Sequence, residues 1–586
     1  MYHRARSPSR PSTSLRPIST ASSLSTSATA ANLAVDKSRR STSESPSRLT
    51  RRNDRSGGRR SRAVILIMIV LIIFLVLGSL TLRSNAVQEP WALRDASCPD
   101  YKSYSTRRHG PLSSGLLHLP YQRPVSECRT FRSEEVERVI NDLKDKLVDP
   151  DISRLFENCF PNTLDTTVRW HLPGRAPQSF IVTGDINAEW IRDSTNQLSP
   201  YFSLLKNDAP LRQLVLGAIH TQAEFLTYSP YCNAFQPPLQ SRIKPNSNEQ
   251  TDVVNPAYDP ALVFECKYEL DSLASFLELA NKYFDATGDS SFVTKDPYFM
   301  EAIRNVVMVL DEQALTTYDD DGNDLRSRYT FQRQTTKGTE TLSLHGAGNP
   351  TNANTSLIRS AFRPSDDATI LQFFIPANAF IAVQLQRAKK LFVAAGLNDL
   401  ANDLYSRGET IEKGIWEHGV YEHKVFGKVF AYEVDGYGGL INMDDANLPS
   451  LLSLPLMGFV DASNDVYQNT RRMLLSKNGN PYFLRGPDFA GIGGPHIGVR
   501  YAWPMSLLVL IRTSNDDGEI KSALELVKRT TGGLGLMHES VNVRHSADYT
   551  RPWFAWCNSE FGKTILDLAA RKPHLLFGDG AEAYST

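Results

Sequence analysis

Residues 136–147 read VERVINDLKDKL, and this stretch shows the pattern that decides the fold. Its apolar positions recur three or four residues apart, so they fall on one face of a helix. They are Val136, Val139, Ile140, Leu143 and Leu147. Ser133 stands just before the segment, where a capping side chain is expected. The stretch is therefore predicted to be an amphipathic helix packed on a core.

The same helical pattern recurs along the chain, and strand-like runs are short and few. Further predicted helices cover 209–228, 268–287, 297–314, 374–396, 398–417, 463–476, 503–513, 518–530 and 552–570. The segments between them are long and rich in Gly, Pro, Asn and Asp, notably 232–262, 316–369 and 478–500. Because helix bundles favour short connections, these loops predict an all-α toroid with elaborate loops at one rim. Short β-hairpins within several loops are the alternative to irregular loops.

The N-terminal part predicts a membrane anchor. Residues 63–82 read AVILIMIVLIIFLVLGSLTL, an uncharged run that spans roughly 30 Å as a helix. Six arginines crowd its N-terminal side and only Arg83 follows it, so the preceding tail is expected in the cytosol. This predicts a single-pass type II membrane protein with its main body in the lumen of the Golgi or endoplasmic reticulum. A buried core helix is the alternative.

The charged residues divide the chain into a basic tail and an acidic body. Residues 1–62 contain 14 Lys/Arg and 3 Asp/Glu and are predicted to be a disordered basic tail. The whole chain has 64 Lys/Arg and 64 Asp/Glu, so the remaining residues contain 50 basic and 61 acidic side chains. That acidic remainder does not favour a nucleic acid partner. Residues 83–130 are predicted to be a stem and lead-in, and 131–586 one folded domain.

The cysteines agree with a lumenal body. All six follow the apolar run, which predicts disulfides in an oxidising compartment, with their pairing left open and buried free thiols as the alternative. They are Cys98, Cys128, Cys159, Cys232, Cys266 and Cys557. The sequon Asn354-Thr355-Ser356 predicts glycosylation of Asn354.

The first chemical cluster is FIVTGDINAEWIRDSTNQ, residues 180–197. Arg192 offers planar donors, while Asp185 and Asp193 offer acceptors. Trp190 adds an aromatic face, and Glu189 adds a further carboxyl group. A sugar ring needs such a mixed set, because it has several hydroxyl groups and an apolar C–H face. A salt-bridged surface turn is the alternative.

The second cluster places Asp366 and Asp367 directly before an apolar helix, preceded by Arg363. A carboxyl group buried in apolar surroundings has a raised pKa, as a general acid requires. An ordinary helix cap is the alternative.

The third cluster combines His538 and Glu539 with the later Trp553 and Trp556, which suggests a base beside a stacking platform. A pair of core tryptophans with a solvated glutamate is the alternative. The pair His538-Glu539 does not begin a zinc motif, because Asn542 stands where a second histidine is needed. No metal or nucleotide cofactor is predicted.

Five segments together resemble glycoside hydrolase family 125, the exo-α-1,6-mannosidases. They are TGDINAEWIRDS (183–194), KYELDS (267–272), FRPSDDA…IPANAF (362–380), GPHIGVRYAWP (494–504) and MHES…YTRPWFAWCNS (537–559). The resemblance implies an (α/α)6 barrel and a metal-independent, inverting enzyme that removes terminal mannose from a glycan. It also implies a substrate-binding set of Asp185, Trp190, Arg192, Asp193, Arg363, His496, Trp503, His538, Trp553 and Trp556.

A more distant similarity to glucoamylase-type enzymes implies the catalytic roles. Asp366 or Asp367 corresponds to the acid, with Asp366 favoured, and Glu539 corresponds to the base. Glu560 is the rival base, although it lies within a predicted helix. Two other functions remain open. One is a glycan-binding protein without turnover, and the other is a glycosyltransferase that uses the acidic run 319–321.

Overall fold

The amphipathic segments form helices in the computed structural model, which describes residues 98–586. Helix α3 (Glu134–Lys146) buries the predicted face, and its capping residue is Ser133, whose hydroxyl accepts a hydrogen bond of 3.1 Å from the N–H of Val136. The nine other predicted helices also form, with ends shifted by a few residues. Hydrophobic periodicity therefore located most of the regular structure.

The predicted tail (1–62) and membrane span (63–82) lie outside the described residues. Within 98–586, no helix is both long enough and apolar enough to cross a membrane.

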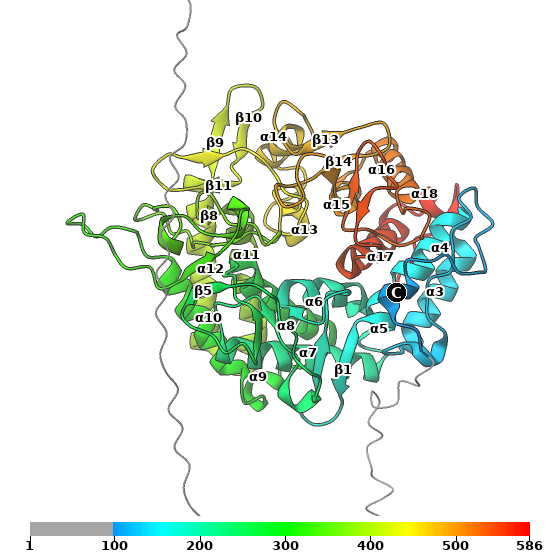
Figure 1. The fold of residues 1–586 in the computed structure, drawn as a ribbon, viewed down its shortest axis with the longest axis horizontal. Helices are drawn as coiled ribbons and strands as arrows, with labels where there is room; N and C mark the ends of the chain where they lie inside the picture. Colours follow the sequence, from blue (N-terminus) through cyan, green and yellow to red (C-terminus); the bar gives the residue numbers. More distant parts are fainter. Residues whose placement is uncertain (1–97) are drawn as a thin grey trace, which may run out of the picture. The chain divides into compact units, whose positions relative to one another are not determined.

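Six helices form an inner ring in which each helix contacts the next (Figure 1). In order they are α6 (Ile191–Leu198), α8 (Leu270–Thr287), α11 (Ile375–Ala394), α13 (Leu454–Met457), α15 (Pro504–Thr513) and α17 (Ala555–Arg571). The last helix, α17, contacts the first, α6, so the ring closes. Figure 1 shows the chain passing once around this ring, so that its last helices lie beside its first.

A second layer of helices surrounds the ring. Its members are α4 (Pro150–Cys159), α7 (Ala209–Tyr228), α10 (Phe299–Gln313), α12 (Asn398–His418), α14 (Asp465–Leu474) and α16 (Asp517–Arg529). Helix α12 packs on α11, α16 on α15 and α4 on α17. Short helices complete the described chain: α2 (Tyr101–Tyr104), α5 (Asn162–Thr166), α9 (Phe292–Lys295) and α18 (His574–Phe577). Two concentric layers of six helices are the predicted (α/α)6 architecture.

The loops carry short antiparallel strands, as the alternative interpretation of the loops expected. Four pairs form within the described residues: β1 (Val168–Leu172) with β2 (Gln178–Ile181), β5 (Asp252–Asn255) with β7 (Thr330–Arg333), β9 (Val420–His423) with β10 (Gly427–Phe430), and β13 (Phe483–Arg485) with β14 (Ala490–Ile492). The described residues also form three sheets of three strands. In the first, β4 (Ala234–Phe235) lies between β3 (Glu189–Trp190) and β6 (Val263–Glu265), and in the second, β11 (Glu433–Val434) lies between β8 (Phe373–Phe374) and β12 (Leu440–Ile441). In the third, β16 (Ser540–Asn542) lies between β15 (Tyr501–Ala502) and β17 (Tyr549–Thr550).

Residues 98–130, assigned to a stem from the sequence, instead pack on the helical body. Leu119 is buried in the main core, and the buried Nε of Arg123 lies 2.7 Å from Oδ2 of Asp165. The ring of Tyr101 meets that of Trp553 edge to face, 4.9 Å between centroids. The sequence pattern did not reveal this packing because single side chains make these contacts, without a periodic apolar face.

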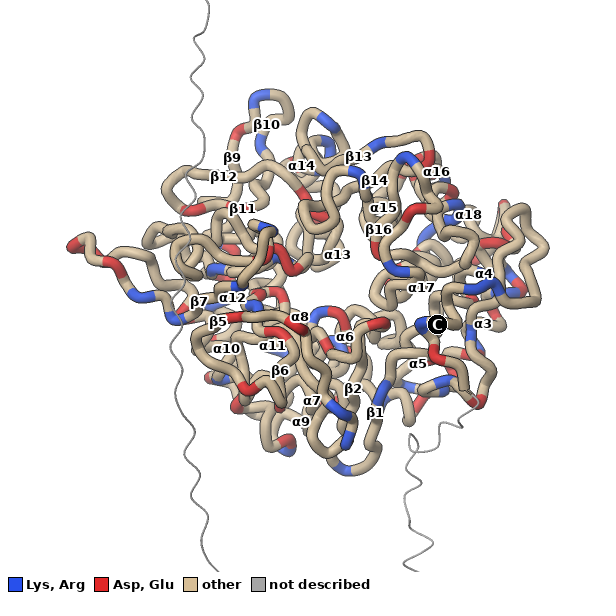
Figure 2. The backbone as a smooth tube through the Cα atoms, in the orientation of Figure 1, with Lys and Arg blue, Asp and Glu red and all other residues tan. Residues whose placement is uncertain are grey.

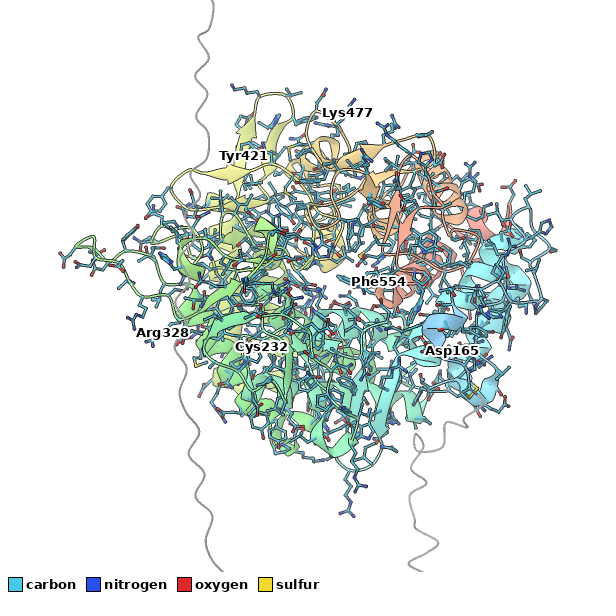
Figure 3. All side chains as sticks on the ribbon, in the orientation of Figure 1. Asp165, Cys232, Arg328, Tyr421, Lys477 and Phe554 are labelled. Carbon is cyan, nitrogen blue, oxygen red and sulfur yellow. A yellow bond between two sulfur atoms is a disulfide. The ribbon has the colours of Figure 1, made fainter. Side chains whose placement is uncertain are left out.

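The described cysteines form two disulfides, Cys98–Cys128 and Cys232–Cys266, which confirms that the chain contains such bonds. Cys232 is labelled in Figure 3. Cys159 and Cys557 are free and buried. Figure 2 shows Lys and Arg interspersed with Asp and Glu along the backbone of the ring.

Candidate active site

A cavity of about 290 Å³ lies at the N-terminal ends of inner-ring helices. Trp190, Trp503 and Phe554 line it, and they are the residues that precede α6, α15 and α17. Figure 3 labels Phe554 near the centre of the ring. The closed ring therefore brings together segments that are far apart in the sequence.

Asp366 and Glu539 both line this cavity. Asp366 occupies a tight turn with a left-handed φ of 64°, where its N–H donates to the carbonyl of Arg363 at 2.9 Å. Its side chain is 26% exposed, whereas that of Asp367 is 1% exposed and has Oδ1 3.3 Å from Nδ1 of His496. Asp366 is thus the member of the pair on the cavity wall.

Two cations control the charge of Asp366. Burial alone would raise its pKa, but the positive charges of Lys267 and Arg192 hold the pKa at about 2. Lys267 is 4% exposed, and Nη2 of Arg192 lies 3.7 Å from Oδ1 of Asp366. This differs from the raised pKa expected from the sequence, because the surroundings of Asp366 are charged rather than apolar.

Glu269 shares this environment. Its carboxyl group is fully buried and interacts with that of Asp366, and Nη1 of Arg192 lies 2.6 Å from its Oε2. Burial raises the pKa of Glu269 well above its usual range, although Arg192 partly opposes the effect. Burial thus favours the protonated form of Glu269, whereas the two cations favour the ionised form of Asp366, and the two carboxyl groups titrate as a coupled pair.

Glu539 stands directly before β16 and has a different partner. Its Oε1 lies 3.3 Å from Nε of Arg551, and Nη1 of the same guanidinium donates to Oδ1 of Asp185 at 3.0 Å. Arg551 itself lines the cavity. It therefore fixes the base candidate relative to the loop that carries Asp185.

Arg192 and Asp193, both predicted to bind the substrate, form an ion pair on the first turn of α6 that is called the clamp from here on. Nη2 of Arg192 lies 3.3 Å from Oδ2 of Asp193, and both residues line the cavity. Burial raises the pKa of Asp193 to about 6, against the opposing charge of Arg192. Trp190, His496, Trp503 and Trp556, also predicted from the sequence, line the cavity too.

Several residues of the wall have a buried polar atom without a protein partner. Six such atoms belong to Thr183, Trp190, Arg192, Ser365, Trp503 and Trp556. Buried polar groups are nearly always hydrogen-bonded in folded proteins, so a cluster of unpaired polar atoms indicates a binding site for a polar ligand. Donors and acceptors mixed with indole rings suit a sugar.

Five predicted site residues do not line the cavity: Asp185, Arg363, Asp367, His538 and Trp553. Arg363 begins the turn that carries Asp366, and its buried Nε lies 2.6 Å from Oε1 of Glu433. Nδ1 of His538 lies 3.0 Å from the carbonyl oxygen of Arg551, and burial lowers the pKa of His538 to about 4.

Trp553 supports the loop that carries Asp185 rather than the cavity itself. A Cβ atom at Gly184 would lie 2.9 Å from the indole ring, and Gly184 has a φ of 138°, so only glycine fits there. The five residues therefore surround the wall and support the groups that line it.

Two sequence alternatives lose their structural basis. Oε2 of Glu560 lies 2.6 Å from Arg512, its Oε1 lies 2.8 Å from Lys563, and it does not line the cavity. The acidic run 319–321 lies in a turn where Asp319 accepts hydrogen bonds from the N–H groups of Asp321 and Asn323, and it does not line the cavity either. Among the described residues, no group of three or more His, Cys, Asp or Glu could hold a metal ion.

Sequence reasoning missed Lys267, Glu269 and Arg551 as individual site residues. All three lie within segments that carried the family resemblance, which was the available signal. Glu265 and Arg333 also line the cavity, paired at 2.7 Å. They come from separate strands, and nothing in the sequence linked them.

Comparisons with known proteins agree with this geometry. The family model described as metal-independent alpha-mannosidase (GH125) matches residues 149–566. The meiotically up-regulated gene 157 protein of Schizosaccharomyces pombe is 56% identical over 495 residues, which cover 84% of this chain and 96% of the relative. A solved Streptococcus pneumoniae structure from the metal-independent alpha mannosidases, in a non-productive complex with alpha-1,6-mannobiose, is 34% identical with a TM-score of 0.67. The match covers 74% of this chain and 98% of that one. The chain therefore belongs to the GH125 family and is a glycoside hydrolase.

Proposed function

We propose that this hydrolase removes terminal α-1,6-linked mannose from glycans by an inverting acid/base mechanism that uses no metal. The observation that carries the proposal is that Asp366 and Glu539 line one cavity together with the Arg192–Asp193 clamp. The alpha-1,6-mannobiose bound to the bacterial relative supports the choice of sugar and linkage.

Asp366 protonates the glycosidic oxygen, and Glu539 removes a proton from the water that attacks C1. An inverting pair needs carboxyl groups roughly 6.5–9.5 Å apart, on opposite sides of the sugar, to admit that water. Lys267 and Arg192 favour the ionised form of Asp366, so Asp366 must take up a proton before it acts, and the neighbouring Glu269, whose pKa is raised, is the group that we propose as its source. Arg192 and Asp193 hold the terminal sugar during the reaction.

The same proposal places the enzyme in the lumen of the secretory pathway, anchored by residues 63–82. Two disulfides support an oxidising compartment. The side chain of Asn354 is exposed, as a glycosylation site requires.

Product stereochemistry tests the mechanism. Proton NMR of a fresh digest of an α-1,6-mannobioside should show β-mannose before mutarotation. If α-mannose appears first, inversion is excluded. If no mannose is released, the chain is a glycan-binding protein without turnover.

A further inference from the structure

A wider groove continues outward from the active-site cavity. Its volume is about 1050 Å³, and three residues, Ile186, Asn248 and Phe264, line both the groove and the cavity. The ring of Phe264 also meets that of Trp190 on the cavity wall edge to face, 5.5 Å between centroids. The two hollows therefore form one continuous surface.

The groove has the chemistry of an uncharged, polyhydroxylated ligand. Its polar walls carry the amides of Asn187, Asn246 and Asn248 and the hydroxyl of Ser247. Its apolar part comes from Ile186, Ile243 and Phe264. The charged residues are two of each sign, Lys102, Arg169, Asp185 and Glu249, so no net charge selects an ionic polymer. Amides and hydroxyls beside apolar faces match the alternating surface of a sugar chain.

The loop that forms one wall, residues 243–250, is held in place without a core of its own. Nε2 of Gln236 donates to the carbonyl of Asn246 at 2.6 Å, and the N–H of Asn246 donates to Oε1 of Gln236 at 3.1 Å. Nδ2 of Asn248 donates to the carbonyl of Phe264 at 2.7 Å. Gln236 is 3% exposed, so these bonds fix the exposed loop to the body. A preformed wall lowers the entropy that a ligand must lose on binding.

We propose that this groove binds the distal sugars of the substrate, beyond the sugar that becomes the leaving group. The inference rests on the proposed function: when a terminal sugar occupies the cavity, the remainder of its glycan must leave through the mouth, where the groove begins. The natural substrate is then an uncharged oligosaccharide longer than a disaccharide, and the enzyme prefers it to a mannobioside.

The test blocks the groove without touching the cavity. Ser247 is exposed and lines the groove but not the cavity, so Ser247→Trp fills the groove alone. The substrates are an α-1,6-mannobioside and an α-1,6-linked mannotetraoside, and the readout is kcat/KM of the full chain for each. Each distal sugar contributes a few hydrogen bonds of modest net strength, so the block should lower kcat/KM for the tetraoside roughly tenfold. The value for the mannobioside should not change.

Ser463→Trp is the matched control, because Ser463 is also an exposed loop serine and lines neither hollow. Its ratio of the two kcat/KM values should equal that of the wild type. The proposal is overturned if the wild type does not prefer the tetraoside, or if Ser247→Trp leaves the ratio unchanged. Calorimetric titration of the tetraoside separates this result from failure of the proposed function. If neither substrate is cleaved, weaker binding to Ser247→Trp than to Ser463→Trp still supports the groove, and equal binding refutes it.

Discussion

Glu560 and Glu539 are both buried carboxyl groups of this barrel, yet their partners differ. Glu560 is fully buried, and its two oxygens lie 2.6 Å from Arg512 and 2.8 Å from Lys563. Glu539 lines the cavity, and its ion pair with Arg551 is longer, at 3.3 Å. The oxygens of Glu560 are occupied by the protein, whereas Glu539 keeps capacity for a ligand. Whether both oxygens are paired, rather than the length of any one ion pair, separates these two glutamates.

Glu189 and Asp366 repeat the contrast. Glu189 is fully buried and accepts a hydrogen bond of 2.9 Å from the N–H of Ile181, and burial raises its pKa to about 8. Asp366 is 26% exposed, and cations hold its pKa at about 2 against the effect of burial. The following substitutions test whether each kind of carboxyl group serves stability or turnover.

Glu539→Gln should have the largest effect on turnover. Loss of a general base typically costs about 10²–10⁴-fold in rate, so mannose release from an α-1,6-mannobioside should fall by at least that range. The amide keeps the volume of the side chain, so the melting temperature should stay nearly unchanged. Turnover at the wild-type level would refute the assignment of Glu539 as the base.

Glu560→Gln should show the opposite result. Removing one member of a buried ion pair leaves an uncompensated charge and costs about 3–5 kcal/mol of unfolding free energy, measured by urea denaturation. The kcat of the folded variant should match that of the wild type. Glu301→Gln is the control, because Glu301 pairs with Arg304 on the surface and its loss should cost less than about 1 kcal/mol. Equal losses in the two variants would contradict the comparison.

Glu189→Gln should change how stability depends on pH. Below about pH 4.5 the wild-type glutamate is neutral in both states. As the pH rises to about 8, the unfolded chain loses this proton while the folded chain keeps it. The free energy of unfolding of the wild type therefore falls as the pH rises, by up to about 1.4 kcal/mol per pH unit.

The glutamine variant lacks this loss, so it should gain stability relative to the wild type between pH 5 and pH 8. Urea denaturation at both values measures the difference. A difference that stays constant would show that Glu189 is not buried in its neutral form.

Lys267→Met should have a smaller effect, on the pH profile of turnover. Lys267 is the cation that lowers the pKa of Asp366 most, so its loss raises that pKa. A general acid acts in its protonated form, so the fall of kcat/KM with rising pH should move to higher pH. Lys267→Arg keeps the charge and should retain the wild-type profile. A shift to lower pH in the methionine variant would contradict the role of Asp366.

How far the sequence predicts the fold differs between two inner helices. Helix α11 has a long apolar sequence, and that pattern is sufficient to predict the helix. Helix α6 (IRDSTNQL) went unpredicted, although all eight of its residues are buried. Its side chains are mostly polar because its first turn carries the clamp and its later residues bond to neighbouring elements. Only Ile191 and Leu198 are apolar in this helix of eight residues, so apolar periodicity gives too short a signal to identify it.

By itself the sequence determined the helical barrel and the segments that build the site, because apolar periodicity and local motifs are properties of neighbouring residues. Only the tertiary structure decided which carboxyl groups face the cavity. Asp366 and Asp367 are adjacent, and a left-handed turn exposes the first while the second contacts His496. The charge of Asp366 was likewise hidden, because Lys267 and Arg192 reach it only after the ring closes. Burial and charge depend on residues distant in the chain, and no local pattern encodes them.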